Sequence, residues 1–99
     1  MKTLEFIEKA LNYVDCVEVH KSEGFLDDDN YKPDLYDFLL YHRDESSYQQ
    51  YIFASVNIKK AKKWHLYDEN IKKAGFSEDY QENLKNLCEE YANTPMEER

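Results

Sequence analysis

The sequence predicts an α+β domain, a small antiparallel sheet of about three strands with helices packed on one face, in the order α-β-β-β-α-α. Hydrophobic residues make up 41% of the 99 residues and aromatic residues 15%, which is enough apolar surface for one core. Two glycines and two prolines favour regular elements joined by short loops. We expect a single globular domain over residues 1–95 and a flexible tail over residues 96–99.

The first element is expected to be a helix that ends near Tyr13. Thr3 is a suitable N-cap, and Glu5 lies in the first turn, where a carboxylate interacts favourably with the helix dipole. Apolar residues then recur at helical spacing. The expected buried stripe consists of Leu4, Ile7, Leu11 and Val14, widened by Phe6 and Ala10.

Strands are expected to follow this helix. Residues 16–21 alternate between apolar and polar side chains, which is typical of a short strand. Residues 35–42 and 48–58 are rich in aromatic and β-branched residues, and the polar residues 43–47 between them suit a hairpin loop. In the second hairpin strand, alternation predicts one face of Ile52, Ala54, Val56 and Ile58 and an opposite face of Tyr51, Phe53 and Ser55.

Residues 58–74 have two interpretations. Trp64, Tyr67, Ile71 and Ala74 are spaced as on one face of a helix, which we take as the first interpretation. Alternatively, residues 64–67 form a fourth short strand after a turn at residues 59–63. Under both, Gly75 suits a left-handed helix stop and Phe76 the hydrophobic contact that accompanies it.

The last helix is predicted more simply. Ser77 is its expected N-cap, and the acidic residues Glu78 and Asp79 suit its positive N-terminal end. Residues 93–95, Asn-Thr-Pro, end it. The expected buried stripe consists of Tyr80, Leu84, Leu87 and Tyr91.

The two cysteines, Cys16 and Cys88, lie 72 residues apart among apolar neighbours. This favours two buried free thiols in a reducing compartment, although the spacing alone leaves a disulfide between them open. Residues 1–10 lack the layout of a signal peptide, and no apolar run is long enough to span a membrane. These observations predict a cytoplasmic protein.

The net charge of −8 is unevenly distributed along the chain. Six lysines against two acids give residues 57–75 a net charge of +4, whereas residues 1–33, 34–56 and 76–99 carry −4, −3 and −5. An acidic protein repels nucleic acid and anionic lipid, and its field attracts basic proteins. Charge of this kind also serves solubility alone, and composition does not separate the two.

The acidic run Asp27-Asp28-Asp29 invites comparison with a calcium loop. An EF-hand loop needs oxygen ligands at alternating positions and Gly at position six. Counted from Asp27 the sixth position is Lys32, and counted from Asp28 it is Pro33. Neither register fits, and we expect an acidic loop in solvent.

Catalytic and metal-binding patterns are missing from the sequence. His20, His42 and His65 fall on three different expected elements, without the short His or Cys spacings of a zinc site. Thiols in apolar stripes stay protonated, and two glycines leave little for a phosphate cradle or a strained nucleophile turn. We expect no enzyme activity, no metal and no cofactor. A small enzyme that uses Cys16 or a histidine is the least favoured hypothesis.

Two groups of residues are candidates for binding. Exposed tyrosines flanked by carboxylates are typical of protein-binding surfaces, although tyrosine also simply suits strands. The expected partner-binding residues are Asp27, Asp28, Asp29, Tyr31, Tyr36, Asp37, Tyr48 and Tyr51. The alternative site is a basic patch, a helix face of lysines beside a stacking tryptophan that would contact nucleic acid. It consists of Lys59, Lys60, Lys62, Lys63 and Trp64.

These features together predict a small acidic inhibitor or regulator that docks a basic surface of a nucleic-acid-binding protein or nuclease, a CRISPR-type effector among them. By analogy of class, such domains are found among phage anti-defence (anti-CRISPR) inhibitors and bacterial toxin-immunity proteins. The alternative is a nucleic-acid-associated module that uses the basic patch. No membrane partner is expected, and direct nucleic-acid binding is disfavoured by the acidic pI near 4.8.

Overall fold

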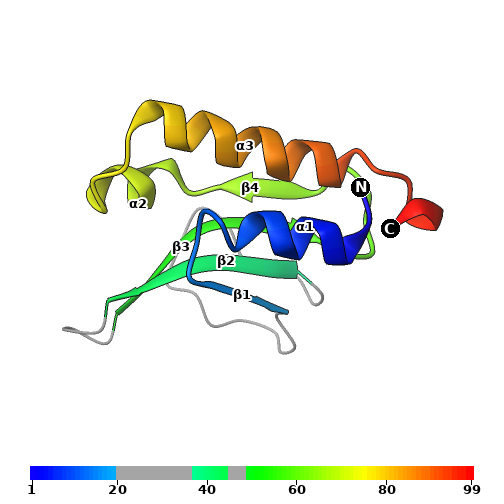
Figure 1. The fold of residues 1–99 in the computed structure, drawn as a ribbon, viewed down its shortest axis with the longest axis horizontal. Coiled ribbons are helices and arrows are strands. Elements are labelled where there is room, and N and C mark those ends of the chain that lie inside the picture. Colours follow the sequence, from blue (N-terminus) through cyan, green and yellow to red (C-terminus); the bar gives the residue numbers. More distant parts are fainter. Residues whose placement is uncertain (20–36, 45–48) are drawn as a thin grey trace.

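A computed structural model describes residues 1–19, 37–44 and 49–99 of the chain. The elements follow the order α-β-β-β-β-α-α with a final 3₁₀ turn (Figure 1). Their bounds are α1 Thr3–Ala10, β1 Cys16–Val19, β2 Asp37–Asp44, β3 Gln49–Asn57, β4 Trp64–Leu66, α2 Asp68–Lys73, α3 Glu78–Ala92 and η1 Met96–Glu98.

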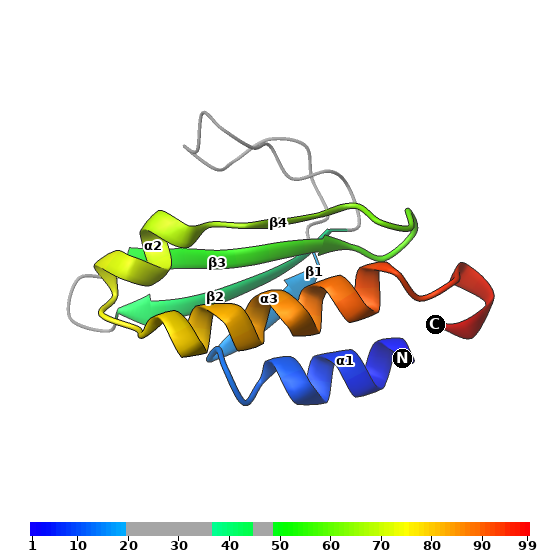
Figure 2. The same ribbon diagram turned by 90° about the horizontal axis from the view of Figure 1, so that it is seen from above.

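The four strands form one antiparallel sheet in the order β1-β2-β3-β4. The β2–β3 hairpin is confirmed, with its pairing running from Asp37 opposite Asn57 to Asp44 opposite Gln49. Helices α1 and α3 run side by side in opposite directions on one face of the sheet (Figure 2). The expected α+β architecture is therefore confirmed, with one strand more than the three in the expected order.

The extra strand comes from residues 58–74, for which the single-helix interpretation is wrong. Trp64–Leu66 is strand β4, which pairs with β3 at residues 54–56. Only Asp68–Lys73 is helical, and Ile71 on this helix is fully buried. The helical spacing of the apolar residues arose from two elements in sequence, because Trp64 packs from a strand and Ile71 from the following helix.

A register shift between Leu40 and Tyr41 changes the faces that alternation predicted for β3. Phe53 and Ala54 both belong to the core cluster under the helices, whereas Ile52 packs with Tyr41 and Tyr67 in a second cluster. An extra residue in one strand moves every later side chain to the other face. The expected shared face of Ile52 with Ala54 is therefore wrong.

Helix α1 is rotated relative to its expected stripe. Leu4 is 66% exposed and Leu11 50% exposed, whereas Phe6 and Ala10 are fully buried. The Phe6 ring stacks on Tyr91 with centroids 4.3 Å apart, so the aromatic side, which buries more apolar area than leucine, faces inward. Thr3 is not a side-chain cap; its hydroxyl shares a hydrogen bond of 2.8 Å with the hydroxyl of Tyr91.

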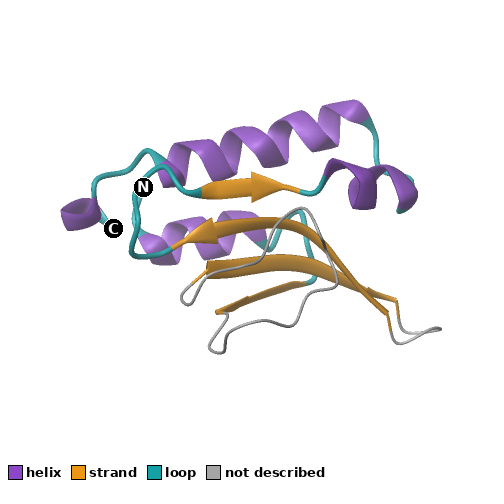
Figure 3. Cartoon of the chain, turned by 180° about the vertical axis from the view of Figure 1, so that it is seen from behind, coloured by secondary structure: helices purple, strands orange, loops and turns teal. Residues whose placement is uncertain are grey.

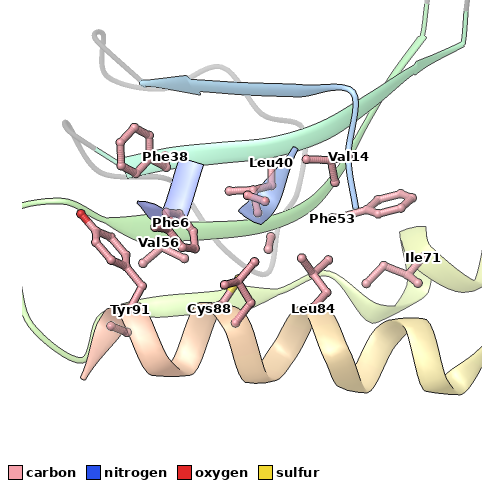
Figure 4. Packing of buried hydrophobic residues seen from close by; sticks show 14 residues of the cluster. Phe6, Val14, Phe38, Leu40, Phe53, Val56, Ile71, Leu84, Cys88 and Tyr91 are labelled. Carbon is pink, nitrogen blue, oxygen red and sulfur yellow. The ribbon is translucent and has the colours of Figure 1, made fainter. Parts of the chain in front are cut away.

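The core lies between α3, α1 and the sheet (Figure 4). Three residues of the expected stripe on α3, Leu84, Leu87 and Tyr91, are buried, and the fourth, Tyr80, is half-buried against the same cluster. The Ser77 cap is confirmed as well, since its hydroxyl accepts the backbone N–H of Tyr80 at 3.2 Å. The expected helix therefore begins and packs as its sequence indicates.

The turn between α2 and α3 also follows the sequence. Gly75 has a positive φ of 85°, which glycine adopts without steric strain. The backbone N–H of Gly75 donates to Lys72 O at 3.0 Å and that of Phe76 to Ile71 O at 3.3 Å, the two bonds of a Schellman motif. This turn fixes Phe76 at the start of α3.

Residues 96–99, the expected C-terminal tail, contact the body of the molecule. They form η1 and end on Arg99, whose guanidinium lies 4.5 Å from the ring centroid of Tyr91. The N-terminal segment, this tail and the β3–β4 turn meet at one end of the molecule (Figure 3). The guanidinium donates to the backbone carbonyls of Thr94, Asn57, Ile58 and Ala92.

Both cysteines are free thiols, Cys88 buried and Cys16 half-buried. No helix in residues 1–19, 37–44 and 49–99 has the length and apolar character needed to cross a membrane.

Candidate functional site

Two of the eight expected partner-binding residues, Asp37 and Tyr51, lie in the described part of the chain. Residues 27–29, Tyr31, Tyr36 and Tyr48 lie outside the described residues and stay predictions. Tyr51 is half-buried on β3, where it packs against the main core cluster. Asp37 begins β2 and is fully buried. The structure therefore does not bring the described members together as one exposed surface.

Asp37 has a structural role that its sequence context did not reveal. Its Oδ1 accepts the side-chain amide of Asn57 at 2.7 Å, and the two residues are paired across β2 and β3. The side-chain Oδ1 of Asn57 in turn accepts the backbone N–H groups of Lys59 at 2.9 Å and Lys60 at 2.8 Å. Asp37 thus orients the side chain that shapes the β3–β4 turn, and its own side chain is buried; its expected role in partner binding stays a prediction.

The basic patch lies on this β3–β4 turn rather than on a helix. The lysines therefore do not share the helix face that the alternative site required. The turn meets the C-terminal end of α3, where the backbone N–H of Lys62 donates to Ala92 O at 2.7 Å. Trp64 is half-buried and packs against the core cluster, whereas a stacking platform for bases would be exposed.

The exposed face of α3 carries the densest unbalanced charge among the described helices. Its 15 residues include five acids and only Lys85 as a base, a net charge of −4. All five carboxylate side chains are exposed, and none is in an ion pair with another described residue. We call this surface the α3 acidic face. It consists of Glu78, Asp79, Glu82, Glu89 and Glu90.

Helix geometry arranges these carboxylates in rows. Glu78, Glu82 and Glu89 stand at i, i+4 and i+11, which places them along one side of the helix over about 16 Å. Asp79 and Glu90, also eleven positions apart, form a neighbouring row. The face is therefore an extended negative ridge rather than a pocket.

The charges of the other two α-helices are more nearly balanced than those of α3. In α1, Lys9 forms an ion pair with Glu5 at 3.2 Å, and its hydrogen bond and charge lower the pKa of the Glu5 carboxyl. In α2, two acids in the first turn and two lysines in the last turn cancel and complement the helix dipole. In α3, by contrast, no base lies in the last turn, and Glu89 and Glu90 are there instead.

Four aromatic side chains are in contact at the N-terminal end of the α3 acidic face. Phe76 stacks on Tyr80 at 4.3 Å and on His42 at 5.3 Å, and meets Phe53 edge-on at 5.4 Å. We call these four residues the aromatic corner. Burial, followed by the charge of Asp15, raises the pKa of Tyr80, so this hydroxyl stays neutral in the physiological range.

Sequence reasoning missed the α3 acidic face as a site. The signal was present in the net charge of −5 over residues 76–99. Consecutive carboxylates, as at residues 27–29, form an acidic cluster in any conformation, whereas carboxylates at helical spacing gather only once the helix forms.

Within residues 1–19, 37–44 and 49–99, no cluster of three or more His, Cys, Asp or Glu side chains is arranged to hold a metal ion. The chemistry open to the α3 acidic face is attraction and hydrogen-bond acceptance. In comparisons with known proteins, no family model, no curated protein and no solved structure matches the chain.

Proposed function

We propose that this protein is a small acidic inhibitor or regulator that docks a basic surface of another protein through the α3 acidic face. The observation that carries the proposal is the set of five exposed carboxylates on one helix without an ion-pair partner among the described residues. Such a ridge accelerates encounter with a cationic surface and selects against anionic ones.

The placement of Glu89 and Glu90 supports a role beyond folding. Carboxylates in the last turn of a helix face its negative end and cost up to about 1 kcal/mol each at the surface. Residues that oppose local stability are expected where a function requires them. For solubility alone, acidic residues at other exposed positions would serve equally well.

The proposed partner is a nucleic-acid-binding protein or nuclease, since clefts that bind phosphate backbones expose arginine and lysine. An extended row of carboxylates of this length can contact the arginine and lysine side chains that otherwise bind phosphates. A protein that covered the cleft would inhibit stoichiometrically, in the manner of anti-defence or toxin-immunity proteins.

Affinity capture from the source cells tests this function. The baits are the wild type, the triple variant Glu78→Gln/Glu82→Gln/Glu89→Gln and a matched control, Glu8→Gln/Glu97→Gln/Glu98→Gln, which removes equal charge from other exposed positions. We expect the wild type and the control to retain a basic protein that the α3 variant loses. Equal capture by all three baits would contradict the proposal.

A gel-shift assay with the purified protein tests the alternative function, which is nucleic-acid association through the basic patch. A duplex or single strand retarded at moderate salt, and released by Lys59→Gln/Lys60→Gln, would favour the alternative. No shift at any protein concentration would remove it.

A further inference from the structure

The exposed side of α1 carries apolar side chains in a row. Four large apolar side chains are exposed among the described residues, and the two most exposed are Leu4 at 66% and Leu11 at 50%. They stand seven residues apart on α1 and its C-cap, so they share one side of the helix, with the half-buried Ile7 between them. We call these three residues the α1 stripe. Single exposed leucines are common, whereas neighbouring ones indicate an interaction surface.

Helix geometry directs the α1 stripe away from α3. At about 100° per residue, Leu4 and Leu11 lie about 140–160° around α1 from Phe6. The Phe6 ring stacks on Tyr91 of α3 at 4.3 Å and lies 5.9 Å from the ring of Phe38 on β2. The two exposed leucines are therefore opposite the contacts that α1 makes with α3 and β2.

Strand β1 lies at the edge of the sheet on this side of the molecule. Helix α3 packs on β3 and β4, whereas α1 is the outer helix, far from β4 (Figure 2). Among the described strands β1 is outermost here, and its sequence Cys-Val-Glu-Val has neither the proline nor the lysine that commonly protects an edge. Val17 and Val19 pack against the same core cluster as Ile7. The edge of β1 and the α1 stripe therefore lie on the same side of the molecule.

The charge and the strand direction of this side suit a second copy of the same chain. Residues 1–11 carry two lysines and two glutamates, so two such surfaces meet without the repulsion that the net charge of −8 causes elsewhere. An edge strand pairs with its own copy about a twofold axis in antiparallel fashion, which continues the order of this sheet. Centred on Val17, the pairing keeps the two Glu18 carboxylates apart, because like charges directly opposite destabilise a strand pair.

We propose that the protein forms a twofold-symmetric dimer in which β1 pairs with β1 of a second copy. The two α1 stripes pack against each other above the paired strands, so that Leu4 and Leu11 are removed from water. The sheets of the two copies become one continuous antiparallel sheet. Helix α3 takes no part in this contact, so the dimer is independent of the proposed function of the α3 acidic face.

Sedimentation velocity of the full chain over a concentration range of about a hundredfold tests the dimer. The variant is Leu4→Lys/Leu11→Lys, since lysine suits a helix and the new charges repel each other across the twofold axis. We expect the wild type to dimerise with rising concentration and the variant to dimerise at least about tenfold more weakly. The matched control, Ala74→Lys/Asn93→Lys, adds equal charge at exposed positions of α2 and α3 and should behave as the wild type.

A wild type that stays monomeric throughout, or a control that dissociates as much as the α1 variant, would overturn the proposal. A monomeric wild type whose capture of a basic partner requires Leu4 and Leu11 would assign the α1 stripe to that partner and would overturn it as well.

Amide hydrogen exchange separates pairing of β1 from contact between the helices alone. Pairing gives the N–H groups at the edge of a strand new acceptors and slows their exchange. We therefore expect residues 16–19 of the wild type to exchange more slowly at high than at low protein concentration, and those of Leu4→Lys/Leu11→Lys to show no such difference. A dimer in which these amides exchange equally at both concentrations would overturn the edge-to-edge arrangement.

Discussion

At the scale of single residues, Lys62 belongs to the candidate basic patch and also has a strained backbone conformation. It is a non-glycine residue with a φ of 63°, held by the hydrogen bond from its N–H to Ala92 O. Left-handed backbone costs an L-residue about 1 kcal/mol or more. We expect Lys62→Gly to raise the free energy of unfolding by about 0.5–1 kcal/mol, measured by urea denaturation.

The matched control for this change is Lys60→Gly in the same turn, where φ is not positive. Glycine there adds freedom to the unfolded chain without relieving strain, so a loss of about 0.5–1 kcal/mol is expected. Equal destabilisation by both substitutions would show that the turn is not strained at Lys62.

The two cysteines should differ in reactivity. Burial raises the pKa of the Cys88 thiol to about 12, so almost no thiolate forms near neutral pH. Cys16 is half-buried at the sheet edge. With a chromogenic disulfide reagent we expect one thiol to react in the native protein and the second only after denaturation.

The variant Cys16→Ser should abolish the native-state reaction, and Cys88→Ser should leave it unchanged. Two thiols that react at the same rate in the native protein would mean that the region around Cys88 opens readily.

At the scale of elements, α3 and the β2–β3 hairpin could be predicted because local signals agree with tertiary packing. Ser77, the apolar stripe and the Schellman turn at Gly75 are all local features. The rotation of α1 depends on the distant ring of Tyr91, and the faces of β3 depend on a register shift against β2. The apolar periodicity of one segment carries no information about its contacts with distant segments.

The carboxylates of α3 should affect stability according to their position on the helix dipole. We expect Glu89→Gln/Glu90→Gln to stabilise the protein by about 0.5–1 kcal/mol and Glu78→Gln, at the N-terminal end, to destabilise it by a few tenths. Thermal unfolding at low salt measures both. A destabilising effect at both ends would mean that these side chains make stabilising contacts.

The C-terminal tail should contribute to the fold through Arg99. Arg99→Met keeps the stem but removes the donors to four backbone carbonyls, so a loss of about 2–3 kcal/mol is expected by urea denaturation. Lys85→Met, on the exposed face of α3, is the control and should change stability by less than about 0.5 kcal/mol. Equal stability of the two variants would contradict an anchored tail.

At the scale of the whole molecule, the net charge indicates that the protein has a negatively charged surface, but it does not indicate where that surface lies. The acidic balance of residues 76–99 follows from composition, whereas its concentration on one exposed face requires the helix. The basic residues 59–63 were expected on a helix, but they form a turn at the far end of α3. Their position follows from the β3–β4 pairing, which no motif within the segment encodes.

The most direct test of the α3 acidic face is the association rate constant with the captured basic partner, measured from about 50 mM to about 500 mM salt. For the wild type and the matched control we expect a fall of about tenfold or more with rising salt. The triple variant Glu78→Gln/Glu82→Gln/Glu89→Gln should associate more slowly at low salt and depend less on salt. Identical rates for all three proteins, unchanged by salt, would contradict the account.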